Sequence, residues 1–331
     1  MAAVALLAAA AAAVAAVPAE RPAPAVSAAE HQQQSSFVPG ARWLDVRGDP
    51  IRAHAGHLLL IGGLYHWYGM EYIGAGSPPG VPHTVNVYVS SDLYNWTPAG
   101  VAISSTLYIS RPKVIHNPLT GQFVMWCKAT PGAAAFVSHS PLGPFTPVFR
   151  GDLAGRQVGG LTVYQDPQEP SAAWLAYSAK PSDEPSLPRA MMVLALSANW
   201  TWPAAQETAT YAGHLEGPAV FFSQGQYYLW TSHTAGWDGS PAVVHCAPTM
   251  NSSAWSLCGP GNPTHNRSAF QSQSTDVVAV PGDTTGRRFI YMADRWLPYI
   301  NTTESGRYIW LPLDVAGDHS LRVEWHSSWS Y

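Results

Sequence analysis

Glu216 is the carboxylate of this sequence that is best placed to act as a general acid. It stands in the string His214-Leu-Glu-Gly-Pro-Ala-Val-Phe-Phe, directly before an aromatic-rich run. A glutamate at the mouth of an apolar strand would be partly desolvated, which favours the protonated carboxyl group that a proton donor needs. The alternative is a solvated glutamate in a turn.

Other common chemistries have no signature in the chain. The Cys and His residues lack zinc-site spacing, and neither a phosphate-binding glycine loop nor a G-x-S-x-G motif is present. The net charge is −4 without a basic run, so we expect no nucleic-acid partner. The 14 Trp and 15 Tyr residues belong mostly in a core, but exposed aromatic rings can stack on sugar rings.

The element that would position Glu216 recurs along the chain. After residue 40 the sequence shows five aromatic-rich β runs, each preceded by a turn with Gly or polar residues. Each run is followed by a second strand that ends near a Trp, Phe or Pro, and the unit recurs about every 50 to 65 residues. The five runs are His57-LLLIGGLYHWYG, Gly121-QFVMWCKA, Ala172-AWLAYSA, Gly225-QYYLWTS and Arg287-RFIYMADRW.

This repetition predicts an all-β fold, a five-bladed β-propeller with one four-stranded blade per repeat. In a propeller, residues from different repeats meet at the opening where the inner strands begin. We therefore expect the chemistry to lie on polar residues just before or inside each repeat's first strand. A β-sandwich is the alternative, which explains the strands but not their paired repetition.

The N-terminus resembles a secretory leader. Residues 1–19 are apolar and Ala-rich, the first charge is Glu20, and Val17-Pro18-Ala19 offers small residues for cleavage, although a basic n-region is missing. A membrane anchor is the alternative, but the run is short for a span of about 20 residues. We expect a disordered linker over residues 20–39 and one propeller domain over residues 40–331.

Glycosylation sequons and cysteines also indicate the secretory route. We expect a secreted or lumenal glycoprotein, in the extracellular space, the cell wall or the Golgi lumen. Cys246 and Cys258 are close in sequence and flank turn-like residues, which predicts a local disulfide, while Cys127 in an apolar strand is predicted to be a buried free thiol. The five sequons are at Asn95, Asn199, Asn251, Asn266 and Asn301.

The order of the motifs resembles glycoside hydrolase family 43, in its branch of exo-β-1,3-galactanases. The motifs are GDPIRAHAG with GGLYHWYG, SSDLYNW, RPKVIHNPLTGQFVMW, LEGPAVFFSQGQYYLWTSHTAGW, Ser272-Gln273-Ser274-Thr275, and FIYMADRW with RYIWLPL. They span residues 48 to about 325. The resemblance implies a five-bladed propeller that releases galactose from β-1,3-galactan with inversion. Arabinose- and xylose-acting branches of the family exist, and composition does not separate them from this one.

The resemblance also implies catalytic roles. Glu216 matches the family's general acid, and Gln273 matches the glutamine that this branch places where an inverting enzyme would need its base. His54 falls where other family 43 branches carry a catalytic Asp. A hydrogen-bonded channel histidine is the alternative for His54, and we favour it.

Two positions depart from the family pattern. The family motif reads Glu-Arg-Pro-Lys where this chain has Ser110-Arg111-Pro112-Lys113, and the Asp of a family Arg-Asp-Met-Thr stretch is replaced around Gly160, where Asp166 could substitute. Losing both carboxylates would weaken hydrogen bonding to sugar hydroxyls. A relative that binds glycans without turnover is therefore the alternative to an enzyme.

The remaining candidates would form a sugar subsite. Trp237 and Trp296 would stack on a galactose face, or pack within loops. Arg111 and Asp294 would bind hydroxyls, or form a structural pair, and Lys113 could be a plain exposed lysine. We expect an oligo- or polysaccharide substrate, no required cofactor, a monomer and no stable membrane insertion. A structural calcium ion in the channel, as in some family 43 propellers, is left open.

Overall fold

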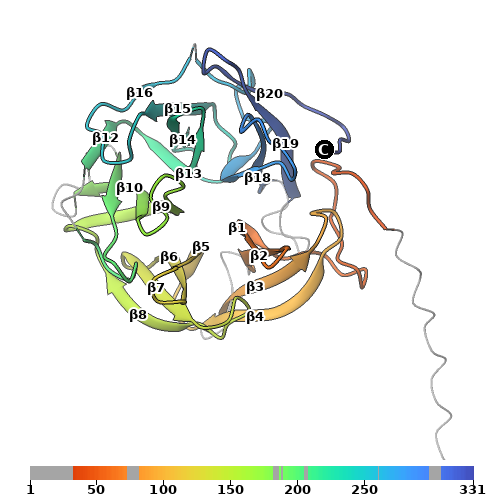
Figure 1. The fold of residues 1–331 in the computed structure, drawn as a ribbon, viewed down its shortest axis with the longest axis horizontal. Helices are drawn as coiled ribbons and strands as arrows, with labels where there is room; N and C mark the ends of the chain where they lie inside the picture. Colours follow the sequence, from red (N-terminus) through yellow and green to blue (C-terminus); the bar gives the residue numbers. More distant parts are fainter. Residues whose placement is uncertain are drawn as a thin grey trace, which may run out of the picture. The chain divides into compact units, whose positions relative to one another are not determined.

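The computed structural model describes residues 33–72, 82–181, 186–187, 189–204, 208–259, 261–297 and 307–331. All regular elements in these ranges are β-strands, and they form five antiparallel four-stranded sheets arranged as a ring (Figure 1). The predicted all-β, five-bladed propeller is confirmed. No helix in the described part of the chain is long and apolar enough to cross a membrane.

Each blade is built from four strands that are consecutive in sequence. Blade 1 contains β1 (His54–Ile61), β2 (Leu64–Met70), β3 (His83–Ser90) and β4 (Thr97–Ser105). Blade 2 contains β5 (Ile109–His116), β6 (Phe123–Ala129), β7 (Ala133–Ser138) and β8 (Thr146–Gly151). Blade 3 contains β9 (Arg156–Gln165), β10 (Ala173–Pro181), β11 (Ala190–Ala195) and β12 (Thr208–Ala212). Blade 4 contains β13 (Leu215–Ser223), β14 (Gln226–His233), β15 (Ala242–Ala247) and β16 (Ser256–Leu257), and blade 5 contains β17 (Gln273–Ala279), β18 (Arg288–Arg295), β19 (Arg307–Val315) and β20 (Leu321–Val323).

The first strand of each blade lies innermost in the ring (Figure 1). The aromatic-rich runs that we expected to open each repeat are mainly the second strands, β2, β6, β10, β14 and β18. The true inner strands carry polar, Gly or Pro residues near their starts, as at Glu216-Gly217-Pro218 in β13 and Gln273-Ser274-Thr275 in β17. Because these strands face the ring axis, their composition departs from ordinary β preference at the place where function is expected.

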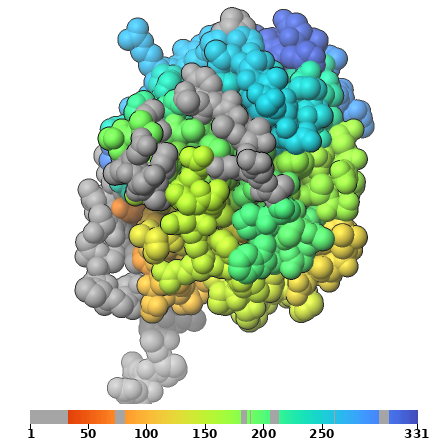
Figure 2. Space-filling view, turned by 90° about the vertical axis from the view of Figure 1, so that its left-hand side faces the viewer, coloured from red at the N-terminus to blue at the C-terminus, as the bar shows by residue number. Residues whose placement is uncertain are grey.

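Apolar side chains fill the interfaces between neighbouring blades. Between blades 2 and 3, Trp126 and Trp200 are fully buried, and the Trp126 indole N–H donates to the Trp200 carbonyl at 2.8 Å. Between blades 4 and 5, the rings of Trp230 and Tyr291 lie 4.9 Å apart. The side view shows consecutive blades, coloured from yellow through green to cyan, packed against one another (Figure 2). The abundance of aromatic residues is therefore explained mainly by packing between blades.

The ring is closed by the segment before β1 rather than by a shared sheet. Phe37 is buried and exchanges two backbone hydrogen bonds with Trp329, at 2.8 and 3.1 Å. The Gly40 N–H donates to the Tyr308 carbonyl at 2.8 Å. Residues 33–39, which the sequence assigned to a linker, thus pack onto the propeller, and the compact unit begins before residue 40. The predicted leader and the rest of the predicted linker lie outside the described residues.

The cysteine predictions are confirmed. Cys246 on β15 and Cys258, which directly follows β16, form a disulfide with their Cα atoms 5.5 Å apart. Cys127 on β6 is a buried free thiol. The disulfide fastens the two-residue strand β16 to the body of blade 4. Of the sequons, Asn301 lies outside the described residues.

Candidate active site

All five inner strands are interrupted near their starts by a shift of register. The shifts leave one or two residues unpaired with the second strand of the blade, as a β-bulge does. Bulges bend a strand and re-aim its side chains, so this feature turns residues of five blades toward one end of the ring. The interrupted positions are Ala55–Gly56, Arg111–Pro112, Gly159–Gly160, Gly217–Pro218 and Thr275.

Three of these bulges contain a residue with left-handed backbone. The φ angles are +50° at Ala55, +53° at Arg111 and +64° at Gly217. For a residue with a side chain this conformation costs roughly 1–2 kcal/mol. At Gly217 a Cβ atom would also lie only 3.1 Å from the Ser274 hydroxyl oxygen, so the bulge of β13 suits glycine.

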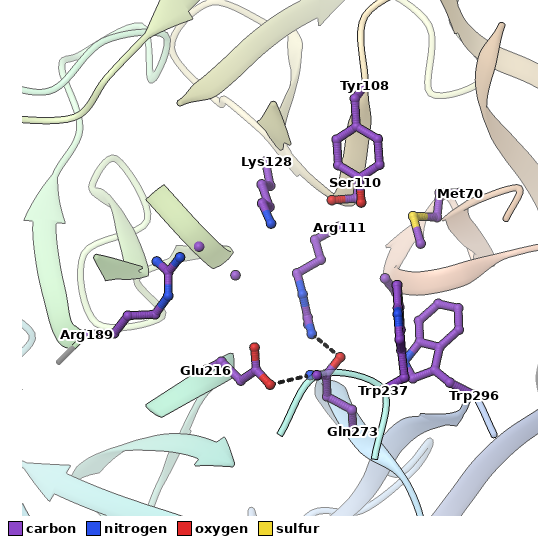
Figure 3. Close-up of a pocket in the computed structure, with 14 residues that line it drawn as sticks. Met70, Tyr108, Ser110, Arg111, Lys128, Arg189, Glu216, Trp237, Gln273 and Trp296 are labelled. Atoms are coloured by element: carbon purple, nitrogen blue, oxygen red, sulfur yellow. Dashed lines mark hydrogen bonds between the residues drawn. The ribbon is translucent and has the colours of Figure 1, made fainter. Parts of the chain in front are cut away.

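A cavity of about 210 Å³ opens where the bulges meet (Figure 3). Residues of all five blades line it, among them Ala55, Ser110, Gly160, Glu216 and Gln273. The structure therefore brings together the two predicted catalytic residues, which are 57 positions apart in sequence. Ser110 and Arg111, predicted to contact the substrate, line the same cavity.

A continuous hydrogen-bond network joins Glu216, Gln273 and Arg111 (Figure 3). The Gln273 Nε2 donates to Glu216 Oε1 at 3.0 Å, and the backbone N–H of Ala235 donates to the same oxygen at 3.2 Å. The Arg111 guanidinium donates to Gln273 Oε1 and to the Ser274 carbonyl, the latter at 3.2 Å. This hydrogen-bond network determines that the NH₂ group of the Gln273 amide, and not its oxygen, faces the Glu216 carboxylate.

Lys113 is fully buried and does not line the cavity, so it is not the plain exposed lysine that the sequence allowed. Its ammonium group donates to the carbonyls of Gly56 and Thr275, two of the bulge residues. Burial lowers the pKa of Lys113 to about 8, and the nearby charge of Asp276 partly offsets this effect. Lysine is almost never fully buried without partners, and the two carbonyl groups are the partners of Lys113 here.

His54 and Asp294 lie behind the cavity wall. His54 is fully buried and stacks on Tyr308 with ring centroids 5.0 Å apart, while Asp294 accepts a hydrogen bond from the backbone N–H of Ala55. Neither residue lines the cavity. They were predicted to contact the substrate, and in the structure they contact the wall of the cavity from behind: Asp294 holds the backbone of the β1 bulge, and His54 packs against Trp296 and Tyr308.

Two tryptophans, for which the sequence left open stacking on a sugar or packing within loops, form one wall of the cavity (Figure 3). The rings of Trp237 and Trp296 lie 5.0 Å apart at 65°. Trp237 is 40% exposed, whereas Trp296 is 2% exposed and also packs against Tyr72. Trp237 therefore offers a ring surface to a ligand, and Trp296 supports it from behind.

Asp166 does not substitute for a carboxylate at Gly160. It follows the far end of β9, six residues from Gly160, which corresponds to about 20 Å of extended strand. There it accepts hydrogen bonds from the Tyr227 hydroxyl at 2.6 Å and the Trp174 indole at 3.2 Å. Its role is to join blades 3 and 4 away from the cavity.

Two cationic residues of the cavity were missed at the level of sequence. Lys128 extends from β6 and Arg189 lies directly before β11, and both point toward the space in front of Glu216 (Figure 3). A charged residue within the apolar run FVMWCKA was the available signal for Lys128. Among the described residues, no group of three or more His, Cys, Asp and Glu side chains is arranged to hold a metal ion.

No family model matches the sequence, and no curated protein matches it. Solved structures do. A family 43 β-1,3-galactosidase solved with galactodeoxynojirimycin has a TM-score of 0.77 and 26% identity, over 89% of this chain and 100% of that one. The exo-β-1,3-galactanase from Phanerochaete chrysosporium solved with β-1,3-galactotriose has a TM-score of 0.76 and 27% identity, over 90% of this chain and 68% of that one.

A third similar structure is also that of a galactan-acting enzyme. The exo-β-1,3-galactanase from Clostridium thermocellum has a TM-score of 0.75 and 27% identity, over 89% of this chain and 66% of that one. The chain is thus similar in sequence and structure to family 43 exo-β-1,3-galactanases, which confirms the resemblance found in the motifs.

Proposed function

We propose that this protein is a glycoside hydrolase that releases galactose from the ends of β-1,3-galactan chains, such as those of arabinogalactans, with inversion. The observation that carries the proposal is the contact of 3.0 Å between Glu216 and Gln273 inside a cavity formed by all five blades. The galactan-acting enzymes to which the chain is similar support the choice of substrate.

Glu216 acts as the general acid in this proposal. One of its carboxyl oxygens accepts two hydrogen bonds, from Gln273 and from the backbone of Ala235, which anchors the side chain. The carboxyl group borders the cavity, so it can protonate the oxygen that leaves when the glycosidic bond breaks.

The composition of the cavity supports inversion. A retaining enzyme needs a second carboxylate about 5–5.5 Å from the acid to form a covalent intermediate. Among the described residues that line the cavity, Glu216 is the sole carboxylate. Without a carboxylate nucleophile, direct attack by water on the anomeric carbon is the favoured route, and the product then has inverted configuration.

Gln273 is suited to position that water. Its amide oxygen is held by Arg111, so the amide is fixed beside the reacting centre. Inverting enzymes separate their two working groups by about 6.5–9.5 Å to admit sugar and water. The contact of 3.0 Å between Glu216 and Gln273 is shorter, so this one hydrogen bond must open when a glycoside enters, while Arg111 continues to hold the amide oxygen of Gln273.

The size of the cavity supports action at chain ends. A volume of about 210 Å³ is below the roughly 300–1,000 Å³ typical of sites for drug-sized ligands. It suits a single sugar unit, with Trp237 available to stack on one face of the ring. The rest of the glycan would extend into solvent.

Binding without turnover is the second candidate function. Ser110 and Gly160 both line the cavity, at the two positions where the resemblance implies carboxylates. Two missing acceptors would leave sugar hydroxyls without partners in the transition state. If this protein only binds, it should retain galactan without releasing galactose.

Incubation of the purified protein with β-1,3-galactan and with aryl galactosides, arabinosides and xylosides separates these functions. Release of galactose with initial formation of the α-anomer, followed by NMR, supports the inverting galactanase. Release of arabinose or xylose instead would reject the substrate. Retention of galactan in affinity electrophoresis without any hydrolysis would support the binding protein.

We also propose that the protein travels the secretory route as a monomeric glycoprotein without a required cofactor. The Ala-rich N-terminus and the five sequons motivate the proposal. Mass spectrometry of the secreted protein before and after enzymatic deglycosylation tests the leader and the glycans. Activity that survives a chelator would support the absence of a required metal ion, and sedimentation analysis would give the oligomeric state.

A further inference from the structure

The cavity carries an excess of positive charge. Among the described residues that line it, three are cationic, Arg111, Lys128 and Arg189, and Glu216 alone is anionic. A site built only for the hydroxyl groups of a neutral sugar has no need of this excess. Positive charge in a concave site attracts and retains anionic ligands.

Two of the three cationic side chains, Lys128 and Arg189, have N–H donors available for a ligand. Arg111 is occupied by Gln273 and Ser274. Within the described part of the chain, the Lys128 ammonium makes no hydrogen bond or ion pair, and the Arg189 guanidinium makes one hydrogen bond, to the Gln157 carbonyl at 3.3 Å. Both side chains are partly buried and point into the cavity (Figure 3).

Gly159 and Gly160 keep the space between these cations open. A Cβ atom at Gly159 would lie 2.7 Å from Nη1 of Arg189, and one at Gly160 would lie 3.2 Å from Nε of Arg111. The diglycine therefore leaves room for a ligand group where a side chain would collide with the guanidinium groups.

The cations also destabilise one another. Burial lowers the pKa of Lys128, and the charges of Arg111 and Arg189 lower it further, against the opposing effect of Glu216. A bound anion would offset this repulsion. The guanidinium of Arg189 suits a carboxylate because its planar set of N–H donors matches two carboxylate oxygens.

We infer that the cavity accepts an acidic sugar, a hexuronate unit whose carboxylate is bound by Lys128 and Arg189. This inference rests on the proposed function in one respect, the terminal sugar of a glycan held in the cavity, and it departs from that function in the identity of the sugar, a hexuronate in place of galactose. A hexuronate has the ring of a hexose with a carboxylate at C6, so it fits a site for one sugar unit. The glycosidic oxygen of the unit then faces Glu216.

Calorimetric titration of the intact protein tests this inference with D-galacturonate, D-galactose and inorganic sulfate at low salt. We expect galacturonate to bind at least about tenfold more tightly than galactose, and its affinity to fall as salt screens the charges. Arg189→Gln and Lys128→Gln should each remove most of this preference. Arg288→Gln is the matched control, since Arg288 is exposed and lies outside the cavity. This variant should bind galacturonate and galactose with the affinities of the unaltered protein.

Equal affinity for galacturonate and galactose in the unaltered protein would overturn the inference, and this comparison needs no variant. Sulfate binding as tight as that of galacturonate would also overturn it, because the site would then be for a free anion. Failure of the proposed function looks different. If the protein prefers galacturonate but hydrolyses no glycan, the inference stands and the proposed enzymatic function is rejected. If it hydrolyses neutral galactan without preferring galacturonate, the proposed function stands and the inference is rejected.

Discussion

The Glu216 carboxylate and the Gln273 amide are in direct contact, with Nε2 donating to Oε1 over 3.0 Å. Because Arg111 holds the other end of the same amide, the three side chains act as one unit. Rotation of Gln273 would break hydrogen bonds to both neighbours. The geometry of the acid is thus set by two inner strands, β13 and β17, that are far apart in sequence.

Replacing Glu216 with Gln should remove the proton donor while preserving shape and sugar binding. General acid catalysis is worth about 10²- to 10⁴-fold in rate, so kcat on galactan should fall by at least that factor. An aryl glycoside, whose leaving group needs less protonation, should lose less activity. Comparison of the two substrates checks the assignment, since misfolding would reduce both rates equally. Unchanged galactan hydrolysis would show that Glu216 is not the acid.

Ser110→Glu should raise galactan hydrolysis if the missing carboxylate limits turnover. Ser110 borders the cavity on β5, so a longer acidic side chain there can reach sugar hydroxyls or water. Ser110→Gln is the control because it adds similar bulk without charge. Steady-state kinetics of both variants gives the result, and equal effects of Glu and Gln would reject a role for the charge.

Lys113→Met should lower stability by about 3 kcal/mol, as expected when one partner of a buried charge pair is lost. The substitution leaves the carbonyls of Gly56 and Thr275 without their donor and removes the charge that opposes Asp276. Urea denaturation followed by tryptophan fluorescence measures the change. The double variant with Asp276→Asn should lose less than the sum of the two single losses. Additive losses would show that the two side chains are not coupled.

Asp276 should make the fold sensitive to acid. Burial alone would raise the pKa of Asp276, but the charge and hydrogen bond of His57 and the charge of Lys113 bring it below the usual value. A carboxyl group whose pKa is lower in the folded state stabilises the fold above its unfolded pKa of about 3.9. That contribution is lost as the pH falls through the folded value.

Thermal unfolding at pH 6, 4 and 3 checks this expectation. The unaltered protein should lose melting temperature across this range more steeply than Asp276→Asn. Asp152→Asn, at an exposed position, controls for the loss of one negative charge. Parallel profiles for the unaltered protein and Asp276→Asn would exclude Asp276 as a source of acid sensitivity.

Loss of the disulfide between Cys246 and Cys258 should cost at most about 3 kcal/mol, because the closed loop is short. Unfolding of a Cys246→Ala, Cys258→Ala double variant measures this value, and Cys127→Ala serves as the cysteine control. Peptide mass spectrometry without reduction should find the linked pair in secreted material. Two free thiols at these positions would contradict the pairing.

The architecture was accessible from sequence because large aromatic residues are needed at every interface between blades. Runs such as QYYLWTS therefore repeat with the blades, and their number gives the blade number. Glu216 and Gln273 could be predicted as site residues from the motifs around them. Their direct contact could not be predicted, because strands β13 and β17 become neighbours only when the ring forms.

The direction of side chains at the site could not be derived from sequence. Alternation along a strand predicts which residues share a face, but a bulge reverses that alternation. All five inner strands carry one, so the neighbouring residues Ser110 and Arg111 both line the cavity, although regular alternation would place them on opposite faces. Arg189 was missed because it lies at the edge of a strand, where no repeat marks it.

The closure between Phe37 and Trp329 brings the two ends of the propeller together without placing a strand of one end into the sheet of the other. Each blade therefore remains a contiguous stretch of sequence. Such a ring is a suitable scaffold for circular permutation: a short peptide could join the ends, and new termini could be opened in a loop between two blades. Every sheet would survive the rearrangement, and a fusion partner could be attached at a position of the ring away from Phe37 and Trp329.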